Sequence, residues 1–368
     1  MTSRLPALRM AAIPAFALVM AACPFFLNAY WIELLNNVGL YAILGLSLNI
    51  ILGHAGLFHM GHAAFYAVGA YATAILNTMY GVPVLWLMPL AGLLAGAFAL
   101  AVARPIIHLR GDYLLIVTIG IVEIVRIALV NNVFSITGGA NGIFGIDRPF
   151  LFGFKIAKPM HFFYLIWGFA AATIFLLSRL ENSRFGRALR YIKEDEVAAE
   201  GSGIDVARYK LAAFAIGAVW AGMTGTIYAA KMTTIAPESF SFAESVVLFS
   251  IVILGGAGSI PGVLLGAFLL IGLPEFFRGL EEYRMLVFGA AMILMMIFRN
   301  QGLLPPGPKH YDIPARPAGA CTKLCCSELL KREVRRLVRK YAYYPENYRV
   351  IVMRMSQKNS CDGLSDFF

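Results

Sequence analysis

Long apolar runs separated by short polar turns dominate the sequence. Most of them approach the roughly 20 residues that a helix needs to cross a bilayer. Ten such runs cover residues 10–27, 34–52, 61–79, 84–103, 113–130, 161–178, 211–230, 244–257, 262–277 and 285–299. The pattern predicts an all-α polytopic membrane protein with about ten transmembrane helices. Composition agrees, because 14% of the residues are charged, against about 25% in soluble domains.

Basic residues predict the orientation of these helices. Arg104 and Arg110 flank one turn, five further Lys or Arg residues follow the run that ends at 178, and Arg299 closes the last run. If the first helix is uncleaved and starts inside the cell, all three basic turns are cytoplasmic, as the positive-inside rule requires. Both termini are then cytoplasmic, and the Asn- and Gly-rich loop 131–160 faces outside.

The runs 244–257 and 262–277 are too short for perpendicular spans. The sequence between them, LGGAGSIPG, predicts short or broken helices with a tight turn. A related stretch, LGHAG at 52–56, resembles the LGGAG at 254–258. Both follow a run that points into the cell.

The C-terminal part has a different composition. Residues 307–368 contain 12 Lys or Arg against 6 Asp or Glu, and they hold four of the five cysteines. We expect two regions, a transmembrane domain at 1–306 and a basic cytoplasmic tail at 307–368. Residues 327–341 could form a basic amphipathic helix on the inner leaflet. Short basic loops and this tail explain the net charge of +10, so no nucleic-acid partner is expected.

The segment 181–210 is a charged island between apolar runs, with 12 of the 52 charged residues of the chain. It predicts two short helices, at 185–192 and 194–200, ended by Gly201-Ser-Gly203. A solvated loop is the simpler interpretation of most charged runs. The small residues at 197–203, however, suit close docking against a partner.

Polar groups inside the apolar runs are the other candidates. Glu123 and Arg126 share a helix face, and either line a translocation path or form a structural ion pair. Asn49 precedes His54, His59 and His62, whose spacing does not suit a metal site. We expect these histidines to form a polar turn and to bond to backbone carbonyls. The glycine-rich loop at 135–142 lacks phosphate-loop spacing, so any ATP must be bound by another chain.

Four ordered stretches resemble the branched-chain amino acid ABC importer permeases of the LivM type. The first is GLYAILGLSLNIILGHAGLFHMGHAAFYAVGAYATAIL at 39–76, and the second runs from Asp112 to Gly139. The third is FGRALR with the later GIDVARYKLAAFAIGAVWAGMTGTIYA, and the fourth is ILGGAGSIPGVLLGAFLL at 253–270. The resemblance covers about residues 30–306.

The resemblance implies a transport subunit of the bacterial inner membrane, without enzymatic activity or a cofactor of its own. Its partners would be a second homologous permease, two cytoplasmic ATPases that bind ATP and magnesium, and a periplasmic protein that delivers Leu, Ile or Val. The coupling motif E-A-A-x-x-x-G of such importers is matched with its glutamate one residue early. The implied coupling residues are Asp195, Glu196, Ala198, Ala199 and Gly203.

For the translocation path, the candidates are Asn49, Glu123, Arg126, Thr137 and Asn141. Two alternatives stay open on the residues alone. One is a related permease for urea, short amides, sugars or nucleosides. The other is an ion-coupled secondary transporter, for which Glu123 would have to carry the ion.

Overall fold

The computed structural model describes residues 26–276 apart from 110, 134, 152 and 153, together with isolated positions at 24 and between 289 and 305. The predicted runs 10–27 and 285–299 lie largely outside the described residues. The basic tail, its expected helix at 327–341 and all five cysteines lie outside them completely. The count of ten helices therefore stays a prediction.

The long helices of the described region all overlap predicted runs. They are α2 (Ala29–Asn49), α3 (His62–Tyr80), α4 (Val84–Ile106), α5 (Asp112–Val130), α6 (Pro159–Asn182) and α9 (Val206–Met232). Within the described residues, five helices are long and apolar enough to cross a membrane, namely α2 with its extension to His54, α4, α5, α6 and α9. The chain is thus a largely helical, multi-pass membrane protein.

Short helical elements occupy the turns and the C-terminal part of the described region. They are α7 (Arg184–Glu194), α8 (Glu196–Gly201), α10 (Phe242–Gly255), α11 (Ile260–Ala267) and α12 (Leu273–Phe276). Two π-helical segments, η1 (Ile50–His54) and η4 (Phe268–Gly272), extend α2 and α11, and two 3₁₀ turns are η2 (Gly139–Asn141) and η3 (Pro237–Phe240).

Four two-residue strands depart from the all-α expectation. β1 (Ile143–Phe144) pairs antiparallel with β4 (Thr234–Ile235), and β2 (Phe150–Leu151) pairs with β3 (Phe154–Lys155). The β1–β4 pair ties the loop after α5 to the end of α9. Periodicity could not predict it, because two residues carry no alternating pattern.

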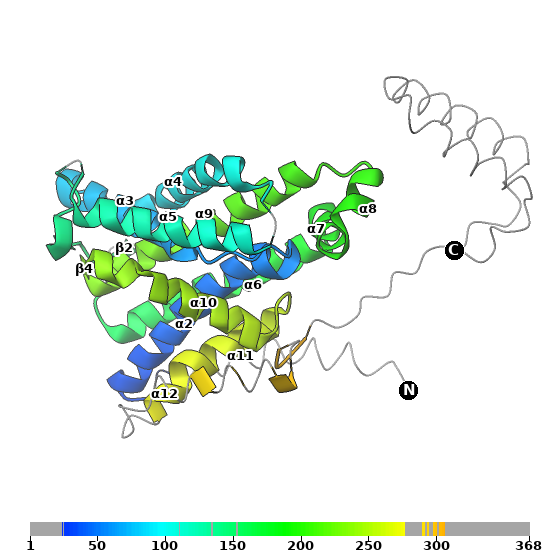
Figure 1. The fold of residues 1–368 in the computed structure, drawn as a ribbon. Coiled ribbons are helices and arrows are strands. Elements are labelled where there is room, and N and C mark those ends of the chain that lie inside the picture. Colours follow the sequence, from blue (N-terminus) through cyan, green and yellow to red (C-terminus); the bar gives the residue numbers. More distant parts are fainter. Residues whose placement is uncertain are drawn as a thin grey trace, which may run out of the picture. The chain divides into compact units, whose positions relative to one another are not determined.

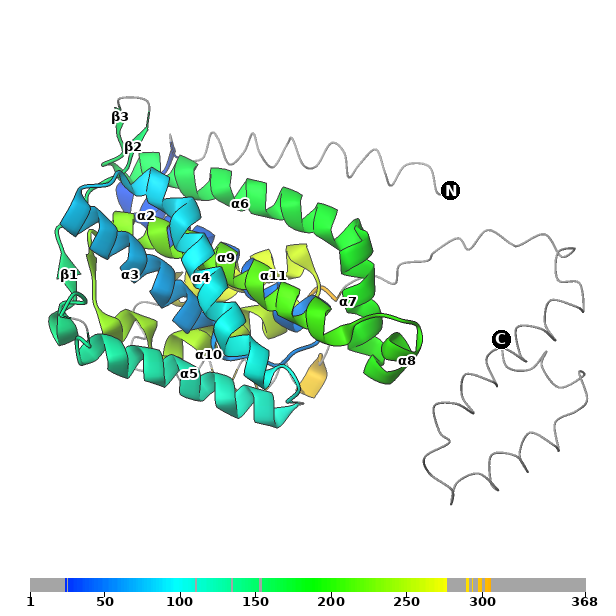
Figure 2. The ribbon, with the colours of Figure 1, turned by 90° about the horizontal axis from the view of Figure 1, so that it is seen from above.

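The bundle has two distinguishable ends. Figures 1 and 2 show α7 and α8 together at one end and the strands at the opposite end. We call these the α7–α8 end and the β end. The end of α2 and the start of α9 lie with α7 and α8, whereas α9 finishes beside β4.

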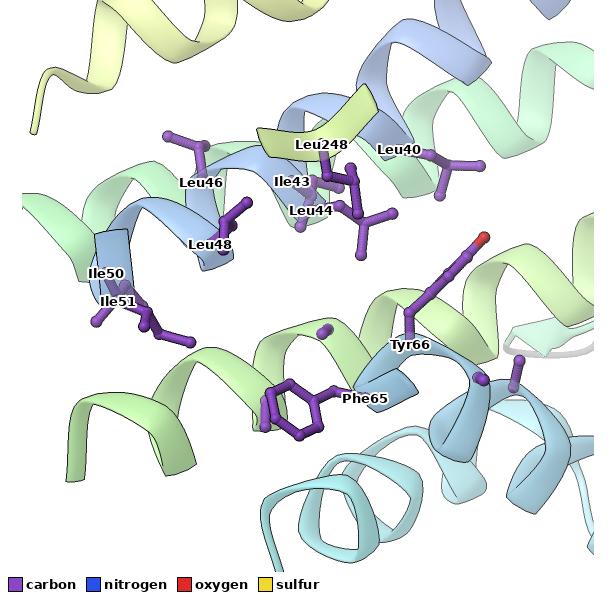
Figure 3. Packing of buried hydrophobic residues seen from close by; sticks show 14 of the residues in the cluster. Leu40, Ile43, Leu44, Leu46, Leu48, Ile50, Ile51, Phe65, Tyr66 and Leu248 are labelled. Atoms are coloured by element: carbon purple, nitrogen blue, oxygen red, sulfur yellow. The ribbon is translucent and has the colours of Figure 1, made fainter. Parts of the chain in front are cut away.

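Apolar side chains of α2, α3 and α10 form the centre of the bundle. Figure 3 shows Ile43 and Leu44 of α2 near Leu248 of α10, with Phe65 on the neighbouring α3. Each of these four side chains is at most 1% exposed. The central position of α2 explains why most of its residues from Val38 to Asn49 are buried.

Small residues let α9 approach its neighbours closely. A Cβ at Gly69 of α3 would lie 2.3 Å from the backbone of Gly222, and a Cβ at Gly222 would lie 2.6 Å from Ala95 of α4. Helices in lipid gain little from apolar burial, so close backbone packing of this kind holds them together.

The turn between α10 and α11 is as tight as its glycines predicted. Gly256 has φ 117° and Gly258 has φ 97°, a region that favours glycine. Gly255 and Gly262 face each other so closely that a Cβ on either would lie 2.3 Å from the carbonyl oxygen of the other. Two helices of 14 and 8 residues are therefore packed as a short hairpin.

Replacing Gly69 with Ala should destabilise the bundle, because the added methyl group meets the α9 backbone. Overpacking a tight core typically costs about 1–3 kcal/mol. The thermal midpoint of the detergent-solubilised subunit should fall measurably. Gly168→Ala on α6 is the matched control, since a Cβ there meets nothing within 4 Å. Equal midpoints for the two variants would contradict the close α3–α9 contact.

Candidate functional site

The charged island forms a compact helical hairpin at the α7–α8 end. Ser183 begins α7, and its Oγ accepts a hydrogen bond from the Gly186 amide at 3.2 Å. Gly186 is required because a Cβ would lie 2.3 Å from the Leu180 carbonyl oxygen at the end of α6. The inner side of α7 is formed by Leu189 and Ile192, both 1% exposed. The segment is therefore a folded element and not an open loop.

Asp195 and Gly203 set the limits of α8. The Asp195 carboxylate accepts hydrogen bonds from the amides of Val197 at 2.8 Å and Ala198 at 3.1 Å, as an N-cap does. Gly203 has φ +84°, and Ile204 donates its amide to the Ala199 carbonyl at 3.1 Å. A left-handed glycine after the last turn is a common way to end a helix. The motif residues at both limits thus shape the helix itself.

The two alanines of the motif face opposite ways. Ala199 is 3% exposed and packs with Ile192 and Val206 in a small apolar cluster. Ala198 is exposed, and the neighbouring Val197 is 68% exposed. The resemblance implies a coupling role for both alanines; in the structure Ala198 is exposed, whereas Ala199 packs inside the hairpin.

Glu196 anchors the hairpin to α9. Its Oε1 lies 2.5 Å from the Nζ of Lys210, which is 3% exposed in the first turns of α9. Removing one partner from such a buried ion pair typically costs about 3–5 kcal/mol. Glu196 therefore does not project freely toward a partner.

A second set of contacts joins the charged segment 181–210 to the end of α2, and no residue spacing predicts it. The Nζ of Lys193 donates to the Gly53 carbonyl oxygen at 2.8 Å. His54 Nε2 lies 3.3 Å from Glu181 Oε1. Partial burial lowers the pKa of the Lys193 amine, against a smaller opposing effect of Glu194. The residue is exposed as a whole, and its amine reaches the η1 backbone.

Asn49 and the three histidines do not form a single polar turn. Asn49 is 1% exposed and its Oδ1 accepts from the Gly258 amide at 2.8 Å. His62 Nε2 lies 2.7 Å from Ser47 Oγ, and His59 has no hydrogen-bond partner among the described residues. The expectation that backbone carbonyls satisfy the histidines was wrong, because side chains of α2 and α6 contact His62 and His54 instead.

Glu123 and Arg126 form the expected pair on α5. Arg126 Nη2 lies 2.8 Å from Glu123 Oε2, and its Nη1 lies 3.7 Å from Glu238 of η3. The two α5 side chains are 34% and 28% exposed. The contact with η3 places them near the β end of α5, which runs along one edge of the bundle in Figure 2.

Thr137 and Asn141 lie in the loop that follows α5. Thr137 is 8% exposed, and its Oγ1 donates to the Leu129 carbonyl at 3.0 Å, closing the loop onto the end of α5. Asn141 is exposed in η2, which packs beside η3. These two residues share the β end with Glu123 and Arg126. Asn49 lies at the opposite end, so the five path candidates do not converge on one site.

A further buried charge, on Lys231, could not be predicted from the sequence. Lys231, in the last turn of α9, lies 2.7 Å from Glu33 Oε1 and 2.5 Å from Asn37 Oδ1, both on α2. Lys231 lies about 200 positions along the chain from Glu33 and Asn37, too far for any spacing rule to relate it to them. The pair secures the two central helices at the β end.

Comparison with known proteins decides the family. The model of the family described as "Branched-chain amino acid transport system / permease component" matches residues 30–296. The chain belongs to this family. It is 41% identical over 314 residues to the high-affinity branched-chain amino acid transport system permease protein LivM of Escherichia coli, covering 79% of this chain and 74% of the relative.

More distant relatives match over nearly their whole length. The probable LivM of Methanocaldococcus jannaschii is 27% identical and is covered to 92% of its length. The permease protein LivH of Escherichia coli is 28% identical, with 74% of this chain and 94% of LivH covered. No solved structure gives a significant match. The matched region contains the hairpin, the α5 pair and the α10–α11 turn.

Replacing Asp195 with Ala should loosen α8 without unfolding the bundle. Loss of an N-cap costs about 1 kcal/mol, which corresponds to roughly fivefold faster hydrogen exchange at the amides of Val197 and Ala198. Exchange measured by mass spectrometry on the solubilised subunit checks this. Asp195→Asn should retain slow exchange, because asparagine caps equally well. Unchanged exchange in Asp195→Ala would show that the cap does not hold the helix.

Proposed function

We propose that the chain is a permease subunit of an ATP-driven importer of the ABC type in the bacterial inner membrane, and that it moves branched-chain amino acids. The observation that carries the proposal is the family match across 30–296 together with 41% identity to a LivM protein. The several apolar helices provide the membrane path. ATP hydrolysis belongs to separate ATPase subunits, and a periplasmic protein delivers the amino acid.

Similarity to both LivM and LivH supports a pore built from two related permeases. Two homologous subunits placed side by side would enclose a path that neither could form alone. α5 suits such an interior position. Its most apolar stretch is 17% buried within this chain, against 78% for α2. Charged side chains are costly on a helix that faces lipid, whereas a helix that lines a polar path can carry an ion pair.

The α7–α8 hairpin is the proposed contact with an ATPase subunit. It is charged, which places it in water, and the internal N-terminus predicted from the basic turns puts it on the cytoplasmic side. Its exposed tip consists of Val197, Ala198 and Glu200. Exposed apolar and small side chains on a rigid helix are what a docking surface requires. The conformation of this tip is stabilised by the other motif residues, Asp195, Glu196, Ala199 and Gly203.

Transport by the reconstituted complex tests the function directly. The chain is placed in liposomes with its homologous permease, the ATPases and the periplasmic protein, and uptake of labelled leucine is measured with and without ATP. We expect ATP-dependent uptake that unlabelled isoleucine and valine reduce. Competition by urea, ribose or a nucleoside instead would assign another substrate. Uptake driven by a proton or sodium gradient without ATP would overturn the importer proposal.

Replacing Ala198 with Arg should separate the permease from its ATPase. The large cation occupies an exposed small position at the centre of the tip, and we expect roughly 30-fold weaker ATPase binding, as for a central interface residue. Co-purification and ATP hydrolysis measure the loss. Val133→Arg is the control, because it adds the same charge at the β end, where Val133 is 60% exposed. Unchanged ATPase binding in Ala198→Arg would place the docking surface elsewhere.

Variants of the α5 pair distinguish a path from a structural bridge. Glu123→Gln and Arg126→Gln should each lower leucine uptake about tenfold, since each removes the ion pair between the two side chains. For a path, the double variant Glu123→Gln/Arg126→Gln should remain as slow as the single variants. Uptake restored in the double variant would show that the pair is a structural bridge.

A further inference from the structure

Three elements meet the last turn of α2 at the α7–α8 end. The π-helical segment η1 contacts α7, the start of α9 and the turn between α10 and α11. The resemblance between LGHAG at 52–56 and LGGAG at 254–258 therefore has a spatial counterpart, because the two stretches lie against each other. The ATPase contact itself involves none of these residues.

Lys193 connects the hairpin to this turn. Its Nζ donates to the Gly53 carbonyl oxygen at 2.8 Å. The last carbonyls of a helix have no partner within the helix, and a cation near them is favourable. Lys193 thus completes the end of α2 from another element. Its side chain also packs on Gly56, where an added Cβ would lie 2.9 Å from Lys193 Cγ.

Asn49 connects the same turn to the α10–α11 hairpin. Its Oδ1 accepts from the Gly258 amide at 2.8 Å, and it is 1% exposed. Gly53 makes this approach possible, since a Cβ there would lie 2.5 Å from the Gly258 nitrogen and 2.1 Å from Asn49 Oδ1. Gly53 therefore takes part in both connections. Its carbonyl accepts from Lys193, and its lack of a side chain leaves room for the Asn49–Gly258 hydrogen bond.

The α10–α11 turn is joined in turn to the residues that follow the last predicted span. The amides of Leu303 and Leu304 donate to the carbonyls of Leu254 at 2.9 Å and Gly255 at 3.1 Å. Gly302 fits because a Cβ would lie 2.4 Å from Gly256 Cα. The η1 turn is thus connected, through the α10–α11 turn, to a distant part of the chain.

We propose that Lys193 and Asn49 are positioning residues that transmit movement of the α7–α8 hairpin to α2 and to the α10–α11 turn. This inference rests on the proposed function, because it needs an ATPase to move the hairpin. The route has two steps, from α7 to Gly53 and from Asn49 to Gly258. The turn between them is a π-helical segment followed by Gly56 with φ +70°, which is less regular than the α-helices on either side.

The test compares ATP hydrolysis with transport in the complete reconstituted complex. Lys193→Met keeps the length of the side chain and removes its donor. We expect the ATPase to remain bound and to hydrolyse ATP, while leucine uptake falls about fivefold or more, at the lower end of typical coupling between sites. The ratio of ATP hydrolysed to leucine moved therefore rises. Lys193→Arg, which can still donate to Gly53, should restore the ratio.

The matched control is Lys158→Met, which makes the same chemical change at an exposed lysine before α6, at the β end. It should leave the ratio unchanged. Asn49→Ala should also raise the ratio of ATP hydrolysed to leucine moved. The double variant Lys193→Met/Asn49→Ala should have the same ratio as the single variant with the higher ratio, because both residues act through one turn. Size-exclusion chromatography identifies any variant that fails to fold.

Two results would overturn the transmission route. One is an unchanged ratio in Lys193→Met, which would show that the contact carries no movement. The other is loss of both ATPase binding and transport, which would show that Lys193 only stabilises the fold of the hairpin. Failure of the proposed function looks different, because the unmodified complex would then show no ATP-dependent leucine uptake or would bind no ATPase.

Discussion

Close backbone contact along α9 is the constraint on which the rest of the structure depends. Gly222 and Gly225 bring α9 against α3, and Gly92 with Ala95 brings α4 against the same helix. Apolar burial alone gives little selectivity among helices that are all apolar, so the positions of small residues decide which faces meet. α9 has no preferred apolar face, as expected for a helix with neighbours on every side.

α9 connects the two ends of the bundle through an ion pair near each of its ends. Lys210 in its first turns is paired with Glu196 of the hairpin, and Lys231 in its last turn is paired with Glu33 of α2. Both lysines are almost completely buried, and each pair lies where a helix end meets a neighbour. Ion pairs of this kind add specificity of register more readily than stability. One pair joins α9 to the hairpin and the other joins it to α2.

Hydropathy predicted the long helices well because their length and composition follow from the bilayer itself. The hairpin was also predictable, since its capping residues and glycines act within a few positions. Contacts between elements were not. Nothing in the spacing of Ala198 and Ala199 tells which one faces inward, because that depends on how α8 packs on Ile192 and Val206. The link from Lys193 to Gly53 likewise spans 140 residues and depends on the tertiary arrangement.

The placement of charges gives the strongest physical argument about the path. Lys193, Lys210 and Lys231 all lie near helix ends, where backbone groups or carboxylates receive them. Glu123 and Arg126 differ, because they lie within α5, are about one third exposed, and have Glu238 as a further neighbour. A charged pair on the least covered of the long helices would be costly against hydrocarbon, even when paired. The proposed pore of two permeases would remove that cost by giving α5 a water-filled path, which argues for α5 at the centre of that pore and not at its rim.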